Sequence, residues 1–347
     1  MFTGKVNDGF FTDNILPYTG KAKPEVIIGP SMGVDSAILK LGDKYMAVAE
    51  DPIFPSATMS PEDFAYVTVH IGASDVAVMG IKPQYMTYSL LLPLDTEEEY
   101  IARLVKAINI YAGELDISIV GGHTGYYGAV TMPTIGGITV WGVKDSFISP
   151  RGAKPGDDVI MTKGAAIEAA ALLAYELDSI LTEKVPEKLV KRAKDRFKEI
   201  SVVKDAEVVN SIGGVHAMHD ATEGGLFRGI WEIAQASGTG MSIDKDKILL
   251  PEDIKEVCAF FGLNPFEIIS EGTLVLTCEK GKSQEIVSAL KDSGIEAAII
   301  GKVTGKSEGC VLNDNGKVKS LLPPEEDKFW GVFFSSLELK NKHAACI

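Results

Sequence analysis

The chain has 347 residues, of which 46% are hydrophobic and 24% are charged, and its formal net charge is -14. This composition is typical of a globular protein with two domains of about 150 residues each. The negative charge argues against a nucleic-acid binder, because counterion release from a phosphate backbone needs many Lys and Arg contacts. An acidic protein that handles a polyanionic substrate needs a divalent metal as an intermediary.

The cysteines are widely spaced and form no C-x-x-C pair, which indicates a reducing compartment rather than a disulfide framework. No apolar run reaches the length of a membrane-spanning helix, and the first residues lack the basic-then-apolar layout of a signal peptide. We therefore expect a cytoplasmic protein that contacts neither membrane nor nucleic acid.

The first half of the chain predicts strands and helices in alternation. A lead-in ends in a short strand at Val26–Ile28 and a Gly/Ser loop. The expected elements that follow are a hairpin about Gly42–Lys44, a helix after Ser60, a strand at 85–92, a helix after Asp95, and strands at 117–120 and 134–143. A Pro/Gly-rich connector at 149–157 predicts a boundary between a domain of residues 1–149 and a domain of residues 150–347.

The second half predicts an α+β domain of similar size. The expected elements are a strand at 158–162, helices over 165–211 interrupted at 183–186, a strand at 215–218, a helix after Gly225, a strand at 273–278, a helix at 283–293, and strands at 297–303 and 309–312. The fold class that we predict for the whole chain is therefore α+β.

The helix that begins after Ser60 carries a carboxylate where an apolar side chain is expected. Ser60 suits the N-cap and Pro61 the first helical position. Asp75 falls on the inner face that is marked by Phe64, Val67, Ile71 and Val78. An unpaired buried carboxylate costs several kcal/mol, roughly, so Asp75 needs a cation, amide groups or a metal beside it, unless it caps a neighbouring element.

Four acidic or glycine-rich segments are predicted as loops in the first half. Their candidate binding residues are Gly33, Asp35, Ser36, Glu50, Asp51, Ser74, Asp75, Gly121, Gly122, His123 and Thr124. Carboxylates from separate elements together with glycines indicate a magnesium–nucleotide site, because hard cations take oxygen ligands and phosphates take amide donors. Each segment alone is unspecific: Asp35 equally suits an Asx turn, and Glu50 a solvated strand end.

Two segments of the second half are candidates as well. Thr222 suits a helix cap, and the glycines after it, Gly224 and Gly225, would let an anion reach the helix amides beside Asp220; the alternative is a simple capped turn. Glu271 immediately precedes an apolar strand and suits a general base or a metal ligand, with an exposed loop acid as the alternative. The P-loop pattern and the Rossmann glycine pattern are both absent, so a nucleotide would need another architecture.

Taken in order, these segments resemble the superfamily of aminoimidazole ribonucleotide synthetase, which includes selenophosphate synthetase, thiamine-monophosphate kinase and the hydrogenase-maturation factor HypE. The resemblance spans nearly the whole chain, and the second half looks most like HypE. The segments that carry it are Gly33–Ala37, Asp51, Ser74–Gly80, Gly121–Thr124, Asp220–Leu226 and Asn264–Gly272.

The resemblance implies two PurM-like domains, the first of which pairs with its copy in a homodimer, and a cleft that holds ATP and Mg²⁺. It implies that Asp35, Asp51 and Asp75 are the metal ligands, and that Asp220 and the glycines after Thr222 line the cleft. The shared chemistry uses ATP to phosphorylate a carbonyl or amide oxygen, so that a nucleophile can replace it or water can be lost. The acceptor would be a small molecule or a carbamoyl group from a maturation partner.

Two departures leave alternatives open. HypE proteins end in Pro-Arg-Ile-Cys and carry the carbamoyl group on that cysteine, whereas here Cys346 is penultimate and is either catalytic or an incidental tail residue. His123 stands where the family usually has an acid. The alternative hypotheses are a small-molecule kinase resembling thiamine-monophosphate kinase, and a nucleotide-binding maturation scaffold without turnover.

Overall fold

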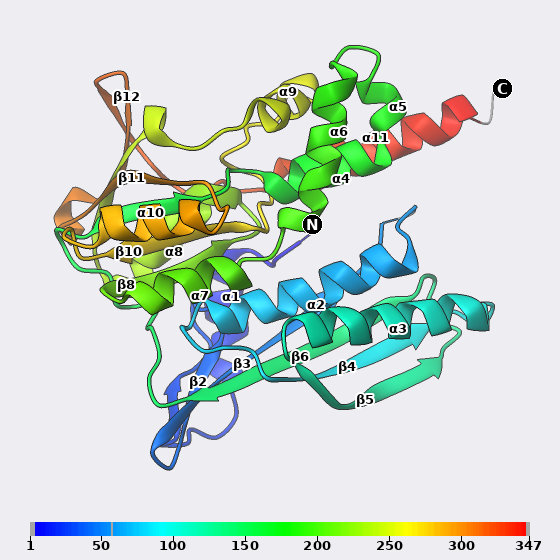
Figure 1. Cartoon of the computed structure of the whole chain (residues 1–347), viewed down its shortest axis with the longest axis horizontal. Coiled ribbons are helices and arrows are strands. Elements are labelled where there is room, and N and C mark those ends of the chain that lie inside the picture. The colour runs from blue at the N-terminus through cyan, green and yellow to red at the C-terminus, as the bar shows by residue number, and fades with distance from the viewer. Residues whose placement is uncertain (1–3, 57, 345–347) are drawn as a thin grey trace. The chain divides into compact units, whose positions relative to one another are not determined.

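The computed structural model of the chain describes residues 4–56 and 58–344. The chain divides into two compact units (Figure 1). We call residues 21–30 and 35–147 the amino-terminal unit, and residues 1–20, 31–34 and 148–347 the carboxyl-terminal unit. In the described residues, no helix is long and apolar enough to cross a membrane.

The amino-terminal unit is a six-stranded sheet with two long helices on one face (Figure 1). Its elements are β1 (Val26–Ile28), β2 (Ala37–Leu41), β3 (Lys44–Ile53), α2 (Pro61–Ala77), β4 (Tyr85–Leu92), α3 (Glu98–Glu114), β5 (Ser118–Tyr126) and β6 (Thr134–Lys144). The strand order is β1-β2-β3-β6-β4-β5, and every neighbouring pair is antiparallel except β4–β5. The alternation of buried side chains along β4 fits a sheet with one covered face.

Helix α2 begins as its sequence predicts but is buried on more than one side. The hydroxyl of Ser60 accepts from the Asp63 N–H at 3.0 Å, and Pro61 is the first helical residue. Thirteen of the 17 residues of α2 are buried, because α2 packs against both the sheet and α3. The single inner face that the sequence predicted for this helix is therefore wrong, and Asp75 and Ile71 are among its partly exposed residues.

Two segments predicted as loops are strand residues instead. Glu50 and Asp51 lie within β3, and His123 lies within β5, which pairs in parallel with β4 through Ser89 opposite His123. Gly122 has a φ of 143°, and a Cβ there would come within 2.2 Å of the Tyr88 carbonyl oxygen. The glycines of this segment permit close strand approach, which a side-chain pattern does not reveal.

The carboxyl-terminal unit is a seven-stranded sheet with helices. Its strands are β7 (Asp158–Thr162), β8 (Val215–Ala221), β9 (Gly240–Asp244), β10 (Thr273–Cys278), β11 (Ala297–Thr304), β12 (Cys310–Asp314) and β13 (Lys317–Ser320), in the order β13-β12-β9-β11-β7-β10-β8. Its α-helices are α1 (Asp8–Asn14), α4 (Ile167–Glu176), α5 (Asp178–Leu181), α6 (Glu187–Asp195), α7 (Val203–Ile212), α8 (Gly225–Ser237), α9 (Glu252–Phe260), α10 (Ser283–Asp292) and α11 (Lys328–Ala344). Short 3₁₀ turns occupy Leu16–Tyr18, Arg196–Glu199, Lys245–Lys247 and Lys306–Glu308.

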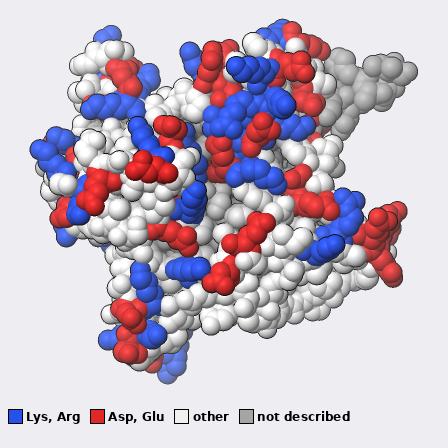
Figure 2. Space-filling view, viewed as in Figure 1, with Lys and Arg blue, Asp and Glu red and all other residues white. Residues whose placement is uncertain are grey.

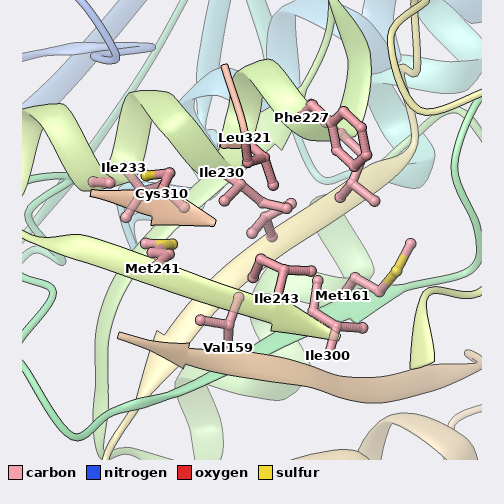
Figure 3. Packing of buried hydrophobic residues seen from close by; sticks show 14 of the residues in the cluster. Val159, Met161, Phe227, Ile230, Ile233, Met241, Ile243, Ile300, Cys310 and Leu321 are labelled. Atoms are coloured by element: carbon pink, nitrogen blue, oxygen red, sulfur yellow. The ribbon is translucent and has the colours of Figure 1, made fainter. Parts of the chain in front are cut away.

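The core of this unit lies between α8 and the sheet (Figure 3). Ile230 and Ile233 of α8 face Met241 and Ile243 of β9, and Ile300 of β11 continues the same cluster. Each such side chain contributes about 1.5–3 kcal/mol when it is fully buried. Ala221 at the end of β8 and Leu226 at the start of α8 belong to the same cluster, which fixes these two ends relative to each other.

The fold class is confirmed as α+β, because each of the two units has a mixed sheet flanked by helices. The helical stretch after residue 165 is broken near Pro186 as expected, and also at Leu177 and Arg196. Helices α1, α9 and α11 and strands β9 and β13 were not predicted, and the predicted β8 ended at Met218, three residues short.

Candidate active site

Three loops of the carboxyl-terminal unit are tied together by buried hydroxyl groups. The Ala166 N–H donates to the Ser270 hydroxyl at 2.7 Å, and that hydroxyl also shares a hydrogen bond of 2.7 Å with the Thr273 hydroxyl. The Ser270 N–H donates to the Thr222 carbonyl at 3.2 Å. The loop before α4, the loop before β10 and the loop before α8 therefore form one structure.

The first of these loops holds an uncommon backbone. Lys163 and Ala166 have φ angles of 59° and 57°, in the left-handed region that costs a non-glycine residue roughly 1 kcal/mol or more. The Lys163 ammonium group donates to Asp205 at 3.0 Å and to the Ser201 carbonyl at 2.7 Å, which holds the loop in place. This conformation positions Glu168 in the first turn of α4.

Glu168 and Glu271 meet where these loops converge. The Glu271 N–H donates to a carboxylate oxygen of Glu168 at 3.3 Å, and Glu271 is 7% exposed. Burial raises the pKa of Glu168 to about 8, and the charges of Glu223 and Asp327 raise it further against the lowering effect of the Glu271 N–H. Glu168 is therefore a carboxyl group that gains or loses a proton near neutral pH. The alternative of an exposed loop acid is wrong for Glu271.

Asp327 and Glu223 complete an acidic group. Asp327 accepts from the Gly224 N–H at 2.9 Å, and its pKa is raised by burial and by the charge of Glu223. Glu223 accepts from the Lys5 N–H at 2.8 Å, and the Lys5 ammonium group donates to the Thr222 hydroxyl at 3.1 Å. We call Glu168, Glu223, Glu271 and Asp327 the acid cluster.

The start of α8 differs from the prediction. Gly224, not Thr222, is the N-cap residue, and no side chain caps the helix. Gly224 donates to Asp327, and Gly225 donates to the Thr222 carbonyl at 3.0 Å. These amides have partners within the chain, so phosphate binding by them stays a prediction that requires a rearrangement of those bonds. Both glycines have positive φ, and a Cβ on Gly225 would come within 2.5 Å of the Ile268 carbonyl oxygen.

Asp220 and the neighbouring histidine belong to β8 rather than to a loop. Asp220 is fully buried. The ring of His219 lies 2.8 Å from a carboxylate oxygen of Glu232, and Gly33 packs against Glu232 with a φ of 69°. A Cβ on Gly33 would come within 2.8 Å of the Glu232 carbonyl oxygen, which explains a glycine there without a ligand.

The predicted magnesium ligands lie in the amino-terminal unit. Asp51 of β3 is opposite Ile138 of β6, and Ile138 lies close to Gly72 of α2, so Asp51 is on the face of the sheet that α2 covers. Within the described part of this unit, Asp35, Asp51 and Asp75 do not form a group whose ligand atoms all lie within 4.8 Å of one another.

The remaining predicted residues of this unit have local partners. The Ser36 hydroxyl donates to the Asp75 carbonyl at 2.7 Å, and the buried Ser74 hydroxyl donates to the His70 carbonyl at 2.8 Å. Exposed His123 lies 2.6 Å from the Tyr127 hydroxyl. Gly121 lies beside it on β5, next to Thr87 of β4.

A pocket of about 770 Å³ in the amino-terminal unit lies between α3 and β5. Thr124 forms part of its wall with apolar residues such as Ile101 and Val105, and the predicted aspartate ligands are not among its lining residues. Its lining does not match a magnesium–phosphate site, so we place more weight on the acid cluster. Cys346, the candidate catalytic cysteine, lies outside the described residues.

Sequence reasoning missed Glu168, Glu223, Asp327 and Lys5. Glu168 lies near the start of a predicted helix, where an acidic residue is usually explained as a solvated side chain that interacts with the helix dipole. Glu223 lies inside the singled-out Asp220–Gly225 segment, and that position was a usable signal. Asp327 and Lys5 reach the cluster only through tertiary folding.

Residues 33–143 match the N-terminal domain, and residues 154–312 the C-terminal domain, of AIR synthase related proteins. The chain therefore belongs to the AIR synthase related family, and the resemblance to the aminoimidazole ribonucleotide synthetase superfamily is confirmed.

Two sequence relatives differ in their named activity. A putative hydrogenase expression/formation protein of Methanocaldococcus jannaschii is 27% identical over 89% of this chain and 91% of its own length. The thiamine-monophosphate kinase of Pyrococcus abyssi is 26% identical over 84% of this chain and 88% of its own length. Relatives of this chain thus include a protein named as a thiamine-monophosphate kinase and a protein named as a putative hydrogenase expression/formation protein.

Two solved structures share the fold. Hydrogenase maturation protein HypE in complex with ATP is 21% identical, with a TM-score of 0.69 over 94% of this chain and 97% of that one. A chain of a HypE–HypF complex is 22% identical, with a TM-score of 0.69 over 84% of this chain and 93% of that one. At these identities the likeness establishes the arrangement of the elements.

Proposed function

We propose that this chain is an ATP-dependent, HypE-like enzyme that activates a carbonyl or amide oxygen by phosphoryl transfer. The observation that carries the proposal is the pairing of Glu168, whose pKa is raised to about 8, with buried Glu271. Such a carboxyl group exchanges a proton at neutral pH, and this chemistry is needed when an activated amide loses a proton together with its phosphorylated oxygen. Glu271 is the proposed base, and Glu168 holds or returns the proton.

Magnesium suits the donors of the amino-terminal unit. Asp35, Asp51 and Asp75 supply carboxylate oxygens, which Mg²⁺ prefers. Mg²⁺ commonly keeps several waters and binds one or two carboxylates together with substrate phosphates, so a closed three-carboxylate cage is not required. The ion would neutralise charge on the phosphates of ATP. The HypE structure solved with ATP supports the nucleotide part of this proposal.

The test combines nucleotide binding with turnover. We expect Asp75→Asn to weaken magnesium-dependent ATP binding in calorimetry, and Glu271→Gln to retain binding while ADP release falls by about 100-fold. Glu187→Gln, in the exposed first turn of α6, is the matched control and should leave both unchanged. Absence of ATP binding to the wild-type protein would refute the proposal, and equal turnover by the Glu271→Gln variant would remove Glu271 from the mechanism.

A second candidate is a small-molecule kinase, which the relative from Pyrococcus abyssi favours. The two candidates differ in their need for Cys346. Only a HypE-like acceptor loses activity in Cys346→Ala, whereas a kinase keeps it and releases a phosphorylated metabolite. Unchanged ADP release together with a phosphorylated product would therefore replace the first proposal with the second.

We also propose that the chain forms a homodimer through its amino-terminal unit. Helices α2 and α3 pack on one face of that sheet, and exposed apolar side chains remain along β4 and β5, including Tyr85 at 40%, Val120 at 54% and Tyr126 at 47%. Sedimentation equilibrium of the wild type and of Val120→Glu tests this, because a dimer through this sheet should weaken with the charge. We further propose that the chain binds a maturation partner, because one of the solved structures that share its fold is a HypE–HypF complex.

A further inference from the structure

The cations of this acidic chain are unevenly distributed. Residues 184–198 contain seven of the 34 Lys and Arg residues but only two of the 48 Asp and Glu residues. This segment spans the turn before α6, α6 itself and the turn after it. Figure 2 shows a concentration of Lys and Arg over these helices, beside mixed or acidic surface elsewhere on the same face. Arg196 of this segment is buried beside Asp253, but the other six cations are exposed or partly exposed, so an overall charge of -14 coexists with a basic surface.

Three of these cations share one side of α6. Lys188, Lys191 and Arg192 are exposed. Lys191 and Arg192 come three and four residues after Lys188, so both are neighbours of Lys188 on the helix surface. The Arg192 guanidinium group pairs with Glu199 at 2.6 Å. Like charges at these spacings destabilise an isolated helix by a few tenths of a kcal/mol per pair, roughly. A complementary partner would remove that repulsion.

A pocket adjoins the start of this helix. It has a volume of about 290 Å³ and is lined by Lys184, Val185, Glu256, Ala259 and Phe260. The Lys184 ammonium group lies 5.9 Å from the centre of the Phe260 ring, and Phe260 is partly exposed. The pocket therefore offers an apolar wall next to a basic helix face.

We infer that the exposed face of α6, with the pocket at Phe260, is a docking surface for a partner protein that presents an acidic segment with one apolar anchor side chain. Charge complementarity identifies the segment, and the pocket accounts for the anchor. A nucleic acid fits less well, because the nine residues of α6 extend only about 13 Å, and a longer polyanion would continue over surface where acids and cations are mixed (Figure 2). This inference is independent of the proposed enzymatic function.

The test uses a defined probe on the full chain. A short fluorescein-labelled peptide with Glu and Asp around one Phe is titrated by anisotropy at physiological salt. We expect Lys188→Glu/Lys191→Glu to weaken binding by about tenfold or more, and rising salt to weaken it for the wild type. Phe260→Ala should weaken the Phe-containing peptide but not a peptide with Ser in its place.

The matched control is Lys306→Glu/Lys317→Glu, which reverses two exposed lysines of the same unit, one in the 3₁₀ turn before β12 and one at the start of β13. It should bind the peptide as the wild type does. Equal weakening by both double variants would show general charge attraction and overturn the inference. The inference is also overturned if the peptide does not bind, or if a single-stranded oligonucleotide of matched charge binds as tightly. Thermal unfolding midpoints of all variants establish that they fold.

Discussion

Replacing Glu168 by Gln should remove a pH dependence from the stability of the chain. The pKa of Glu168 is raised from 4.5 to about 8 in the folded state, so the folded state holds this proton more tightly than the unfolded state does. Stability from this group is therefore full below the unfolded pKa, and it is lost progressively as pH rises through about 8. Gln keeps the shape and an acceptor for the Glu271 N–H but does not ionise.

The size of this pH-dependent contribution to the free energy of unfolding follows from the change in the pKa of Glu168. A pKa raised from 4.5 to about 8 corresponds to about 5 kcal/mol of folding free energy, at about 1.4 kcal/mol per pH unit. Roughly half of this free energy is lost between about pH 6 and pH 9. Glu168 is partly exposed, and solvent screening reduces the effect, so we expect about 1–2 kcal/mol over that interval.

Urea unfolding at several pH values measures how the free energy of unfolding changes with pH. It is applied to the wild type, to Glu168→Gln and to the control Glu187→Gln. Glu168→Gln should gain about 1–2 kcal/mol over the wild type between about pH 6 and pH 9, and Glu187→Gln should follow the wild type. Parallel profiles for the wild type and Glu168→Gln would refute the reasoning, since the Glu168 carboxyl would then have an ordinary pKa.

Three further outcomes are expected. Asp253→Asn removes the carboxylate that pairs with the buried Arg196 guanidinium group and leaves that group with its ion pair to Glu199 at 2.8 Å; the change should cost about 3 kcal/mol in urea unfolding, whereas a loss below about 1 kcal/mol would contradict a buried Arg196–Asp253 pair. Gly72→Ala should destabilise the fold by about 1 kcal/mol despite the better helix propensity of Ala, because a Cβ there would lie 3.1 Å from a Val140 methyl group; a rise in thermal midpoint would contradict this. In the Cys346→Ser variant, a thiol reagent should react only as the protein unfolds, because the three remaining thiols are buried. Burial raises the pKa of each of them, to about 12 for Cys258 and Cys278. Rapid reaction of the native variant would contradict their burial. These thiols are Cys258, Cys278 and Cys310.

Local signals located most of the elements and one part of the site. Ser60 and Pro61 predicted the start of α2, because an N-cap and a proline act within a single turn. The apolar run before Cys278 predicted β10, and the position of Glu271 just before that strand singled it out. Such signals depend on neighbours in sequence, and the structure confirms them.

Other features were decided by residues distant in sequence. Whether Gly122 lies in a loop or a strand depends on pairing with Tyr88, because glycine has no side-chain pattern of its own. Whether the Gly224 N–H at the start of α8 is available to an anion depends on Asp327, which accepts its hydrogen bond and lies 103 residues further along the chain.

The amino-acid sequence by itself determined the family, the α+β class and the chemical kinds of residue available. The tertiary structure alone decided which acids gather into a cluster and how strongly they hold protons. The physical reason is that desolvation and repulsion between charges depend on distance in space, so the pKa of Glu168 is raised first by its burial and then by the charges of Glu223 and Asp327, which are distant from it in sequence.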